Sequence, residues 1–145
     1  MFKHILLPVD GSRTSEAAVG KALGLAKAFG SRVSVIYVID PYPFNGVGAD
    51  FAYGQTEYLS AANAQANSAI KFAKESLNGG GAAVETHVIE AHTAWRGIVD
   101  TAESLGADLI VMGSHGRSGL EKLVLGSVAQ AVLSHTKLAV LVARL

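Results

Sequence analysis

The sequence predicts an α/β protein with a single open parallel sheet of five strands and helices on both faces. Short apolar runs, typical of buried strands, alternate with longer segments whose apolar residues recur every three or four positions. Strands that alternate with helices form parallel sheets, because right-handed crossovers place the helices over the sheet. The length of 145 residues, without an internal repeat, suits one domain over residues 1–145.

The N-terminal part of the chain contains two predicted strands and one helix. HILLPV at 4–9 and RVSVIYVI at 32–39 are continuous apolar runs. Between them lies the apolar stripe of a half-buried helix, followed by Gly30, where a helix C-terminus favours a left-handed residue. The stripe consists of Ala18, Val19, Ala22, Leu23, Ala26 and Phe29.

A loop, a long helix and a strand are predicted in the middle. The loop covers 40–55, which is rich in glycine, proline and aromatic residues that either form a lid or partner surface or anchor the loop to the sheet. The helix ends at NGGG, 78–81, and the partly alternating AAVETHVIE at 82–90 is typical of a strand near a sheet edge. The helix carries Leu59, Ala62, Ala66, Ala69, Ala73 and Leu77 on its apolar positions.

The C-terminal part contains two further helices and two strands. Thr93 is suited to cap a helix that Gly106 closes, and DLIVMG at 108–113 is the most uniformly apolar strand. A helix at 127–135 precedes the last strand, LAVLVA at 138–143. Because that strand is apolar throughout, an edge location would leave backbone groups that invite another chain.

The composition excludes several classes of protein. Twelve basic and twelve acidic residues give zero formal net charge, which argues against binding nucleic acid or an anionic membrane by general electrostatics. Cysteine is absent, and no apolar run reaches the eighteen or so residues that span a bilayer. The N-terminal apolar run is too short for a signal peptide and meets Asp10, so we expect a soluble cytoplasmic protein.

Two junctions between a strand and a helix are candidates for a ligand site. Ligands of open α/β sheets bind beyond the carboxyl ends of the strands, here at VDGS (9–12) and at MGSHG (112–116). Both junctions open into one crevice if the first and fourth strands are neighbours. Gly113 and Gly116 lack side chains and can adopt positive φ, which would let backbone amides approach a ligand.

The start of the last helix adds a possible anion site. Ser127 and Gln130 have the spacing of a capping box, with Ser127 as the N-cap and Gly126 just outside the helix. A helix N-terminus offers unpaired N–H donors and a partial positive charge, which suit a phosphate. The alternative is that a connecting turn and a helix cap require the same residue types without any ligand. Taken alone, the residues leave both interpretations open.

At these residues the sequence resembles the nucleotide-binding branch of the universal stress protein family. That branch carries a glycine, two residues, a glycine, nine residues and then Gly-Ser or Gly-Thr, and 113–127 meets every spacing. ILLPVDGS at 5–12 and VLSHTKLAVLVAR at 132–144 are also similar, although SHTKLAV replaces a proline-containing run found in many relatives. The resemblance spans the whole chain and implies a Rossmann-like fold of the adenine nucleotide alpha-hydrolase type.

The resemblance also implies a ligand and the residues that hold it. The ligand would be ATP, generally accompanied by a divalent ion such as Mg²⁺. Asp10 would hold the ribose, with Pro8 and Val9 shaping that wall, while the backbone of Val38 reads adenine and Met112 packs near the nucleoside. The phosphates would be held by Gly113, Ser114, His115 and Gly116, with Arg117 beside them, and by Gly126, Ser127 and Val128.

The role implied is that of a nucleotide-dependent adapter or sensor in the stress response, acting on an unknown protein partner. Members of the family pair their last strand across a two-fold axis, so we expect a homodimer built on 138–143. The alternative is a slow enzyme that hydrolyses ATP or transfers its phosphate from the same pocket. No side chain of the motif is an obvious base for activating water, so we assign no catalytic residue.

Other motifs that carry chemistry are missing. The sequence has no G-x-x-x-x-G-K-[ST], and no G-x-G-x-x-G follows the first strand, which excludes two common nucleotide sites. The five histidines lack the paired spacing of metal ligands, so we predict no metal site. Ser12, His115 and Asp10 could be drawn as a hydrolytic triad, but no G-x-S-x-G nucleophile elbow supports it.

Overall fold

The computed structural model describes residues 1–41, 49–116 and 125–145, and for residues 49–53 it describes the backbone alone. Five parallel strands form one sheet in the order β3-β2-β1-β4-β5. The strands are β1 (His4–Pro8), β2 (Arg32–Ile39), β3 (Ala83–Glu90), β4 (Leu109–Gly113) and β5 (Ala139–Ala143). The helices are α1 (Arg13–Phe29), α2 (Ala49–Gly79), α3 (Ala94–Leu105) and α4 (Ser127–His135).

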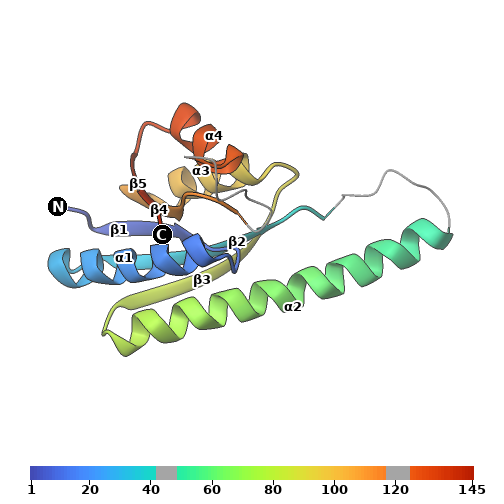
Figure 1. Ribbon diagram of the computed structural model, residues 1–145, viewed down its shortest axis with the longest axis horizontal. Helices are drawn as coiled ribbons and strands as arrows, with labels where there is room; N and C mark the ends of the chain where they lie inside the picture. Colours follow the sequence, from blue (N-terminus) through green and yellow to red (C-terminus); the bar gives the residue numbers. More distant parts are fainter. Residues whose placement is uncertain (42–48, 117–124) are drawn as a thin grey trace.

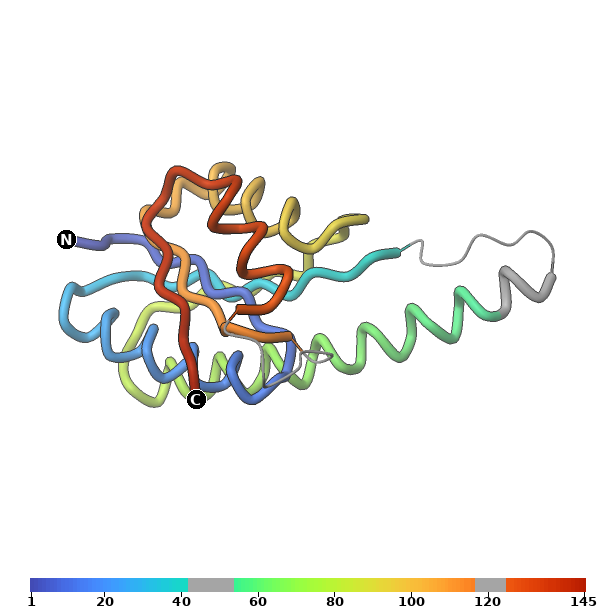
Figure 2. Tube along the Cα trace, turned by 45° about the horizontal axis from the view of Figure 1, so that its top comes forward, coloured from blue at the N-terminus to red at the C-terminus, as the bar shows by residue number. Residues whose placement is uncertain are grey.

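Helices cover both faces of the sheet, as the alternation predicts. Helices α1 and α2 lie on one face, and α3 and α4 lie on the other (Figures 1 and 2). The core accordingly has two halves, one on each side of the strands. Ile5 and Leu7 of β1 point into the half that α1 and α2 cover, whereas Leu6 points into the half that α3 and α4 cover. This alternation along one strand is expected of side chains that leave a sheet on opposite faces.

The central strands separate toward their carboxyl ends, and this separation opens a crevice. β1 pairs with β4 over Ile5↔Leu109 and Leu6↔Ile110 alone, whereas β1 stays paired with β2 as far as Pro8. On its other side, β4 is paired with β5 along its whole length, from Leu109 to Gly113. The two strand ends are therefore neighbours, as the sequence interpretation required, and they diverge at the point where ligands bind in open α/β sheets.

The predicted ends of two helices are confirmed by their backbone conformations. Gly30 follows α1 with φ 67°, and Gly106 follows α3 with φ 72°, both in the left-handed region where glycine is favoured. Their amides donate hydrogen bonds to Ala26 O and Ala102 O, which satisfies carbonyl groups at the helix ends. Thr93 is the N-cap residue of α3, as predicted, although its side chain makes no capping hydrogen bond.

Helix α2 begins earlier than predicted, and this corrects the loop interpretation of 40–55. The helix starts at Ala49, so residues 49–55 are helical, while residues 42–48 lie outside the described residues. The composition was misleading because the prolines stand at 41 and 43, whereas residues 49–55 contain one glycine, Gly54, and no proline. A single glycine costs a helix about 1 kcal/mol, and a helix of 31 residues can absorb that cost. The N-terminal half of α2 projects beyond the carboxyl edge of the sheet (Figures 1 and 2).

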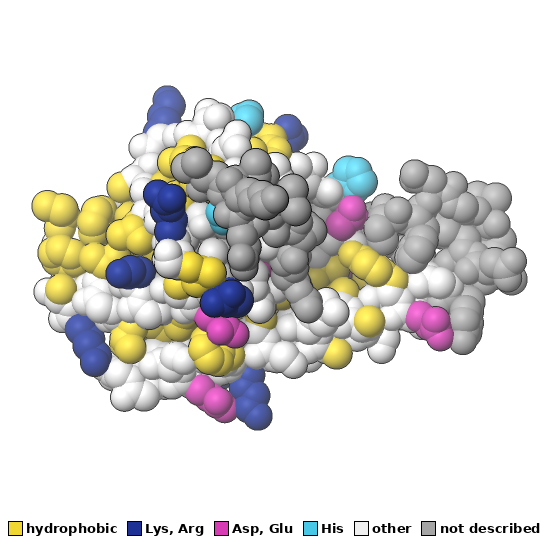
Figure 3. All heavy atoms as spheres, viewed as in Figure 1, with side chains coloured by type: hydrophobic (Ala, Val, Ile, Leu, Met, Phe, Trp, Pro, Cys, Tyr) yellow, Lys and Arg dark blue, Asp and Glu magenta, His cyan; other side chains and the backbone are white. Residues whose placement is uncertain are grey.

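The two edges of the sheet are formed by β3, as its partly alternating pattern predicted, and by β5. In β5, Ala139 is exposed and the next three side chains are partly exposed. Within the described residues, no helix is both long enough and apolar enough to cross a bilayer. Among the described side chains on the face seen in Figure 3, basic and acidic groups are scattered and do not gather in a patch of one sign.

Candidate functional site

A cavity of about 330 Å³ lies at the carboxyl ends of β1 and β4, on the face covered by α3 and α4. Its volume falls within the usual range of small-molecule sites. Twelve predicted site residues line this cavity: Pro8, Val9, Asp10, Val38, Met112, Gly113, Ser114, His115, Gly116, Gly126, Ser127 and Val128. Arg117, the remaining predicted residue, lies outside the described residues. Residues far apart in the sequence therefore meet at one place.

Four further residues, which the sequence did not predict, line the cavity. Ser15 comes from the first turn of α1, Ala129 from α4, and Ala94 and Ile98 from α3. The spacing of Ala94 and Ile98 places both on one face of a helix, so the apolar stripe of α3 carried a signal that could have identified them. Ser15 carried no such signal, because its place in the cavity depends on how α1 packs against the sheet.

The apolar wall of the cavity suits a flat, weakly polar group. Val38 at the end of β2 is half-buried, and Met112 of β4 and Ile98 of α3 are buried. Gly97 allows α3 to lie close to β2, since a Cβ there would be 3.1 Å from Val38 Cγ1 and 3.0 Å from Ala91 Cβ. This wall can hold a nucleobase by van der Waals contact.

Asp10 lies at the border between the apolar wall and the polar end of the cavity. Its Oδ1 accepts a hydrogen bond of 2.9 Å from the Ser12 amide, and its own amide donates to Ser15 Oγ at 3.1 Å. Gly11 completes this tight turn with φ 81°. The other oxygen, Oδ2, lies 3.2 Å from where a Cβ of Gly116 would stand. The carboxylate is thus fixed by the turn, with Oδ2 beside the second glycine of the motif.

The structure corrects the conformational reason given for Gly113 and Gly116. Neither glycine has positive φ, and among the described glycines only Gly11, Gly30, Gly81 and Gly106 do. Gly113 is required by close packing, because a Cβ there would lie 2.5 Å from Thr14 Oγ1 and 2.8 Å from the Ser15 nitrogen. The glycine therefore lets the first turn of α1 touch the end of β4.

Several amides expected to face a phosphate are already used within the protein. The Ser114 amide donates to Ala143 O of β5 at 2.9 Å, and the His115 amide donates to Thr14 Oγ1 at 3.2 Å. The Gly126 amide donates to Ser114 O at 2.6 Å. Among the described residues, the Gly116 amide has no such acceptor. In this conformation the Gly116 amide is thus the backbone N–H group of the turn that can donate a hydrogen bond to a ligand.

The start of α4 supplies further donors, but not through the predicted capping box. Gly126, not Ser127, is the N-cap residue, with φ −74° and ψ 166°, and it contributes no capping side chain. The Gln130 side chain donates to Leu125 O at 2.9 Å instead of reaching back to the Ser127 amide. The N-cap is thus one residue earlier than the box requires, and the Gly126 amide at this position is bonded to Ser114 O.

The absence of a capping side chain leaves the first amides of α4 open. The first helical hydrogen bond runs from the Gln130 amide to Gly126 O. Within the described part of the chain, the amides of Ser127 and Val128 have no acceptor, and both residues line the cavity. Such donors at a helix N-terminus form a ready site for an anion.

The described titratable side chains near the cavity are few. In residues 1–41, 49–116 and 125–145, no three His, Cys, Asp or Glu side chains gather as ligands would. Ser114 Oγ and His115 Nδ1 lie 2.9 Å apart in a hydrogen bond. Asp10 is the carboxylate of the cavity, and a cation carried by a nucleotide could take an oxygen from it.

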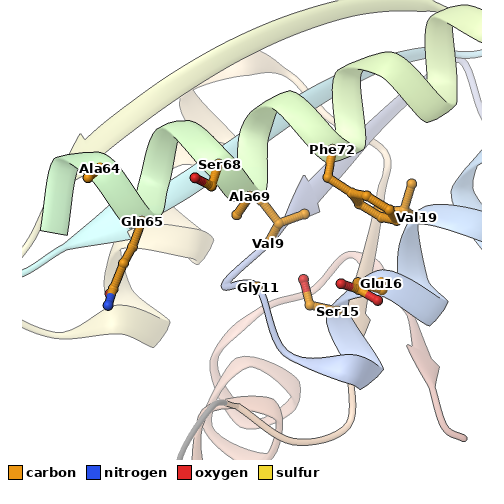
Figure 4. A pocket seen from close by; sticks show the side chains of 10 residues that line it. All are labelled: Val9, Gly11, Ser15, Glu16, Val19, Ala64, Gln65, Ser68, Ala69 and Phe72. Carbon is orange, nitrogen blue, oxygen red and sulfur yellow. The ribbon is translucent and has the colours of Figure 1, made fainter. Parts of the chain in front are cut away.

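A second cavity of about 380 Å³ lies on the opposite face, between α1 and α2 (Figure 4). Phe72 of α2 and Val19 of α1 face each other across it, and Glu16 is its charged lining residue. Val9 and Ser15 line both cavities, so the turn between β1 and α1 separates them. Each cavity thus has one carboxylate in its lining, Glu16 here and Asp10 in the first, but the open amides of Gly116, Ser127 and Val128 lie in the first cavity.

Comparison with known proteins places the chain in a family. The profile of the Universal stress protein family matches residues 1–144. Universal stress protein MJ0531 of Methanocaldococcus jannaschii is 38% identical over 145 residues, which cover 99% of this chain and 83% of that protein. Universal stress protein UspA from Lactobacillus plantarum has a TM-score of 0.87 and 25% identity, with 98% of this chain and 97% of that chain covered. The chain belongs to the universal stress protein family, and its sheet has the Rossmann-like order.

Two more distant structures of the family contain adenine nucleotides. A universal stress protein in complex with cAMP has a TM-score of 0.69 and 22% identity, with 99% of this chain and 97% of that chain covered. The universal stress protein from Archaeoglobus fulgidus in complex with dAMP has a TM-score of 0.66 and 21% identity, with 99% and 98% covered. At these identities the likeness to this chain concerns the fold.

Proposed function

We propose that this universal stress protein binds an adenine nucleotide in the crevice between β1 and β4, and that ATP is its resident ligand. The single observation that carries the proposal is the pairing of an apolar wall with open helix amides in one cavity. A nucleotide has the same two parts, a flat base and an anionic tail. The complexes of relatives with cAMP and dAMP support the choice of adenine.

Each part of the ligand has a matching group in the cavity. Adenine packs against Val38, Ile98 and Met112, and the Asp10 carboxylate accepts hydrogen bonds from ribose hydroxyls, which are donors. The phosphates reach the Gly116 amide and the first turn of α4, whose partial positive charge favours them. Mg²⁺, where present, arrives with the phosphates.

We further propose that two copies pair through β5 and that the dimer acts as a nucleotide-dependent adapter or sensor in the stress response. β5 is an edge strand whose side chains carry no charge, which favours pairing with an identical strand. The Ser114 amide is bonded to Ala143 O, so the turn beside the ligand is joined directly to this edge. Ligand binding and the paired edge can therefore influence each other.

The test is to identify and titrate the ligand. Mass spectrometry of the denatured protein as purified should detect an adenine nucleotide. Calorimetric titration of the ligand-free protein with ATP, ADP, AMP and GTP should show tighter binding of the adenine nucleotides. Absence of a co-purified nucleotide, together with no ATP binding at about 1 mM, would refute the proposal, because that limit corresponds to a binding free energy of only about −4 kcal/mol.

A further inference from the structure

One hydroxyl group holds the backbone of the turn beside the cavity. The hydroxyl group of Thr14, in the first turn of α1, donates a hydrogen bond of 2.5 Å to His115 O. Thr14 Oγ1 also accepts a hydrogen bond of 3.2 Å from the His115 amide. Ser12 Oγ donates a longer bond of 3.3 Å to the same carbonyl. Thr14 is buried, with 6% of its surface exposed. Both backbone polar groups of His115 are thus satisfied by a residue 101 positions earlier in the chain.

The bonds to Thr14 depend on the glycine that precedes the turn. A Cβ at residue 113 would lie 2.5 Å from Thr14 Oγ1 and 2.7 Å from the Thr14 carbonyl carbon, closer than real Cβ atoms approach. Any side chain at 113 would therefore push the first turn of α1 away from His115. The missing side chain of Gly113 thus allows Thr14 to lie close enough to the His115 backbone to form both hydrogen bonds.

The peptide fixed by Thr14 is next to the donors that a phosphate would use. Gly116 follows His115 directly, and the Gly126 amide is bonded to Ser114 O, which joins the start of α4 to the same turn. The position of the His115 peptide consequently sets where the Gly116 amide and the first amides of α4 stand relative to each other. A site whose donors are held before the ligand arrives avoids the cost of ordering them on binding.

We infer that Thr14 is a positioning residue of the anion site, which it organises through the His115 backbone without touching the ligand. The inference rests on the proposed function, since it assumes that the phosphates of an adenine nucleotide occupy that site. According to this inference, the His115 amide stays bonded to Thr14, and the Gly116 amide donates a hydrogen bond to the ligand. It also requires that the turn be held in the ligand-free protein.

The first test uses the unmodified protein and amide hydrogen exchange measured by NMR. Without nucleotide, the His115 amide should exchange at least about tenfold more slowly than the Gly116 amide, since a hydrogen-bonded amide exchanges only when its bond opens. Addition of ATP should slow exchange at Gly116. Equal exchange of the two amides in the ligand-free protein would overturn the inference.

The second test compares three substitutions by calorimetric titration with ATP. Thr14→Val keeps the shape and removes the hydroxyl, Thr14→Ser keeps the hydroxyl, and Thr86→Val removes a partly buried hydroxyl from edge strand β3. Loss of the hydroxyl should weaken ATP binding by about tenfold, the usual effect of one lost hydrogen bond. Thr14→Ser and the Thr86→Val control should bind within about twofold of the unmodified protein.

The outcomes separate the inference from the proposed function. If the unmodified protein binds ATP and Thr14→Val binds it equally well, Thr14 does not position the site, although the function stands. If the unmodified protein binds no adenine nucleotide, the proposed function fails, whatever the exchange rate at His115. If Thr14→Val does not fold, Thr14→Ser decides. The inference is supported if Thr14→Ser folds, exchanges its His115 amide slowly and binds ATP with normal affinity. It is overturned if Thr14→Ser folds but binds ATP weakly.

Discussion

Replacing Ser127 with proline removes one amide from the proposed phosphate site with little disturbance of the fold. Ser127 is the first helical residue of α4, the position where proline is best tolerated because its N–H would have no partner inside the helix. The residue before a proline must be extended, and Gly126 already has φ −74° and ψ 166°. Ser127 is exposed, so the proline ring has room.

The expected magnitude follows from the bond that is lost. A hydrogen bond to a charged group contributes about 1.5–3 kcal/mol, and each 1.4 kcal/mol changes a dissociation constant about tenfold. Ser127→Pro should therefore weaken ATP binding by about 10- to 150-fold. Ser127→Ala is the matched control, because it removes the hydroxyl but keeps the amide, and it should leave the affinity for ATP within about threefold.

Calorimetric titration with ATP and with adenosine checks this result. Adenosine lacks phosphates, so both variants should bind it as the unmodified protein does. Urea unfolding should show that Ser127→Pro changes the free energy of unfolding by less than about 1 kcal/mol. Normal ATP affinity in a folded Ser127→Pro protein would refute the assignment of this amide. Equal loss in both variants would instead identify the hydroxyl as the donor.

Three further predictions concern packing, assembly and pH. Gly113→Ala should lower the free energy of unfolding by about 1–3 kcal/mol in a urea titration, because its Cβ would overlap Thr14 and Ser15. Gly24→Ala is the control: its Cβ would have no atom within 4 Å, so this substitution should raise the free energy of unfolding slightly. Val142→Lys on the partly exposed edge of β5 should convert the proposed dimer to a monomer in sedimentation, and unchanged mass would contradict the β5 interface. Burial lowers the pKa of His4, whose Nε2 is 2.7 Å from Ser34 Oγ, so the unfolded chain takes up the proton more readily. The contribution of His4 to stability should therefore be complete above about pH 6.5 and be lost as the pH falls below that value, so in chemical unfolding His4→Gln should lose less stability than the unmodified protein below about pH 6.5.

Much of the fold could be predicted because it depends on local patterns. The strand at 32–39 and the helix at 127–135 have the predicted bounds, since burial of a strand or a helix face leaves a regular trace in the sequence. Gly30 and Gly106 marked their helix ends because few other residues adopt the left-handed conformation. The predicted site residues converge on one cavity because β1 and β4 are neighbours, which is the condition under which the two junctions share one crevice.

The details of the site could not be predicted, because they depend on contacts between distant segments. Nothing in the local sequence shows that Thr14 reaches the His115 backbone, or that the Ser114 amide is bonded to β5. The capping-box prediction failed for the same reason. Local spacing favours Ser127 as the cap, whereas in the structure Gly126 is the N-cap and its amide is bonded to Ser114 O in the turn after β4.

The motif glycines act through the packing of the protein at least as much as through space for a ligand. A Cβ at Gly113 would meet α1, and a Cβ at Gly126 would meet the Ser114 carbonyl and His115 Cα at 3.0 and 3.3 Å. The missing side chains thus allow α1 and the start of α4 to lie close to the turn, and among the described residues the amides left open are those of Gly116 and the first turn of α4. Loss of binding in a Gly113 or Gly126 variant would therefore not identify the phosphate contacts, because such a variant also displaces the turn. Removal of a single amide at a position that tolerates proline separates the two effects, which is why Ser127 is the more informative residue.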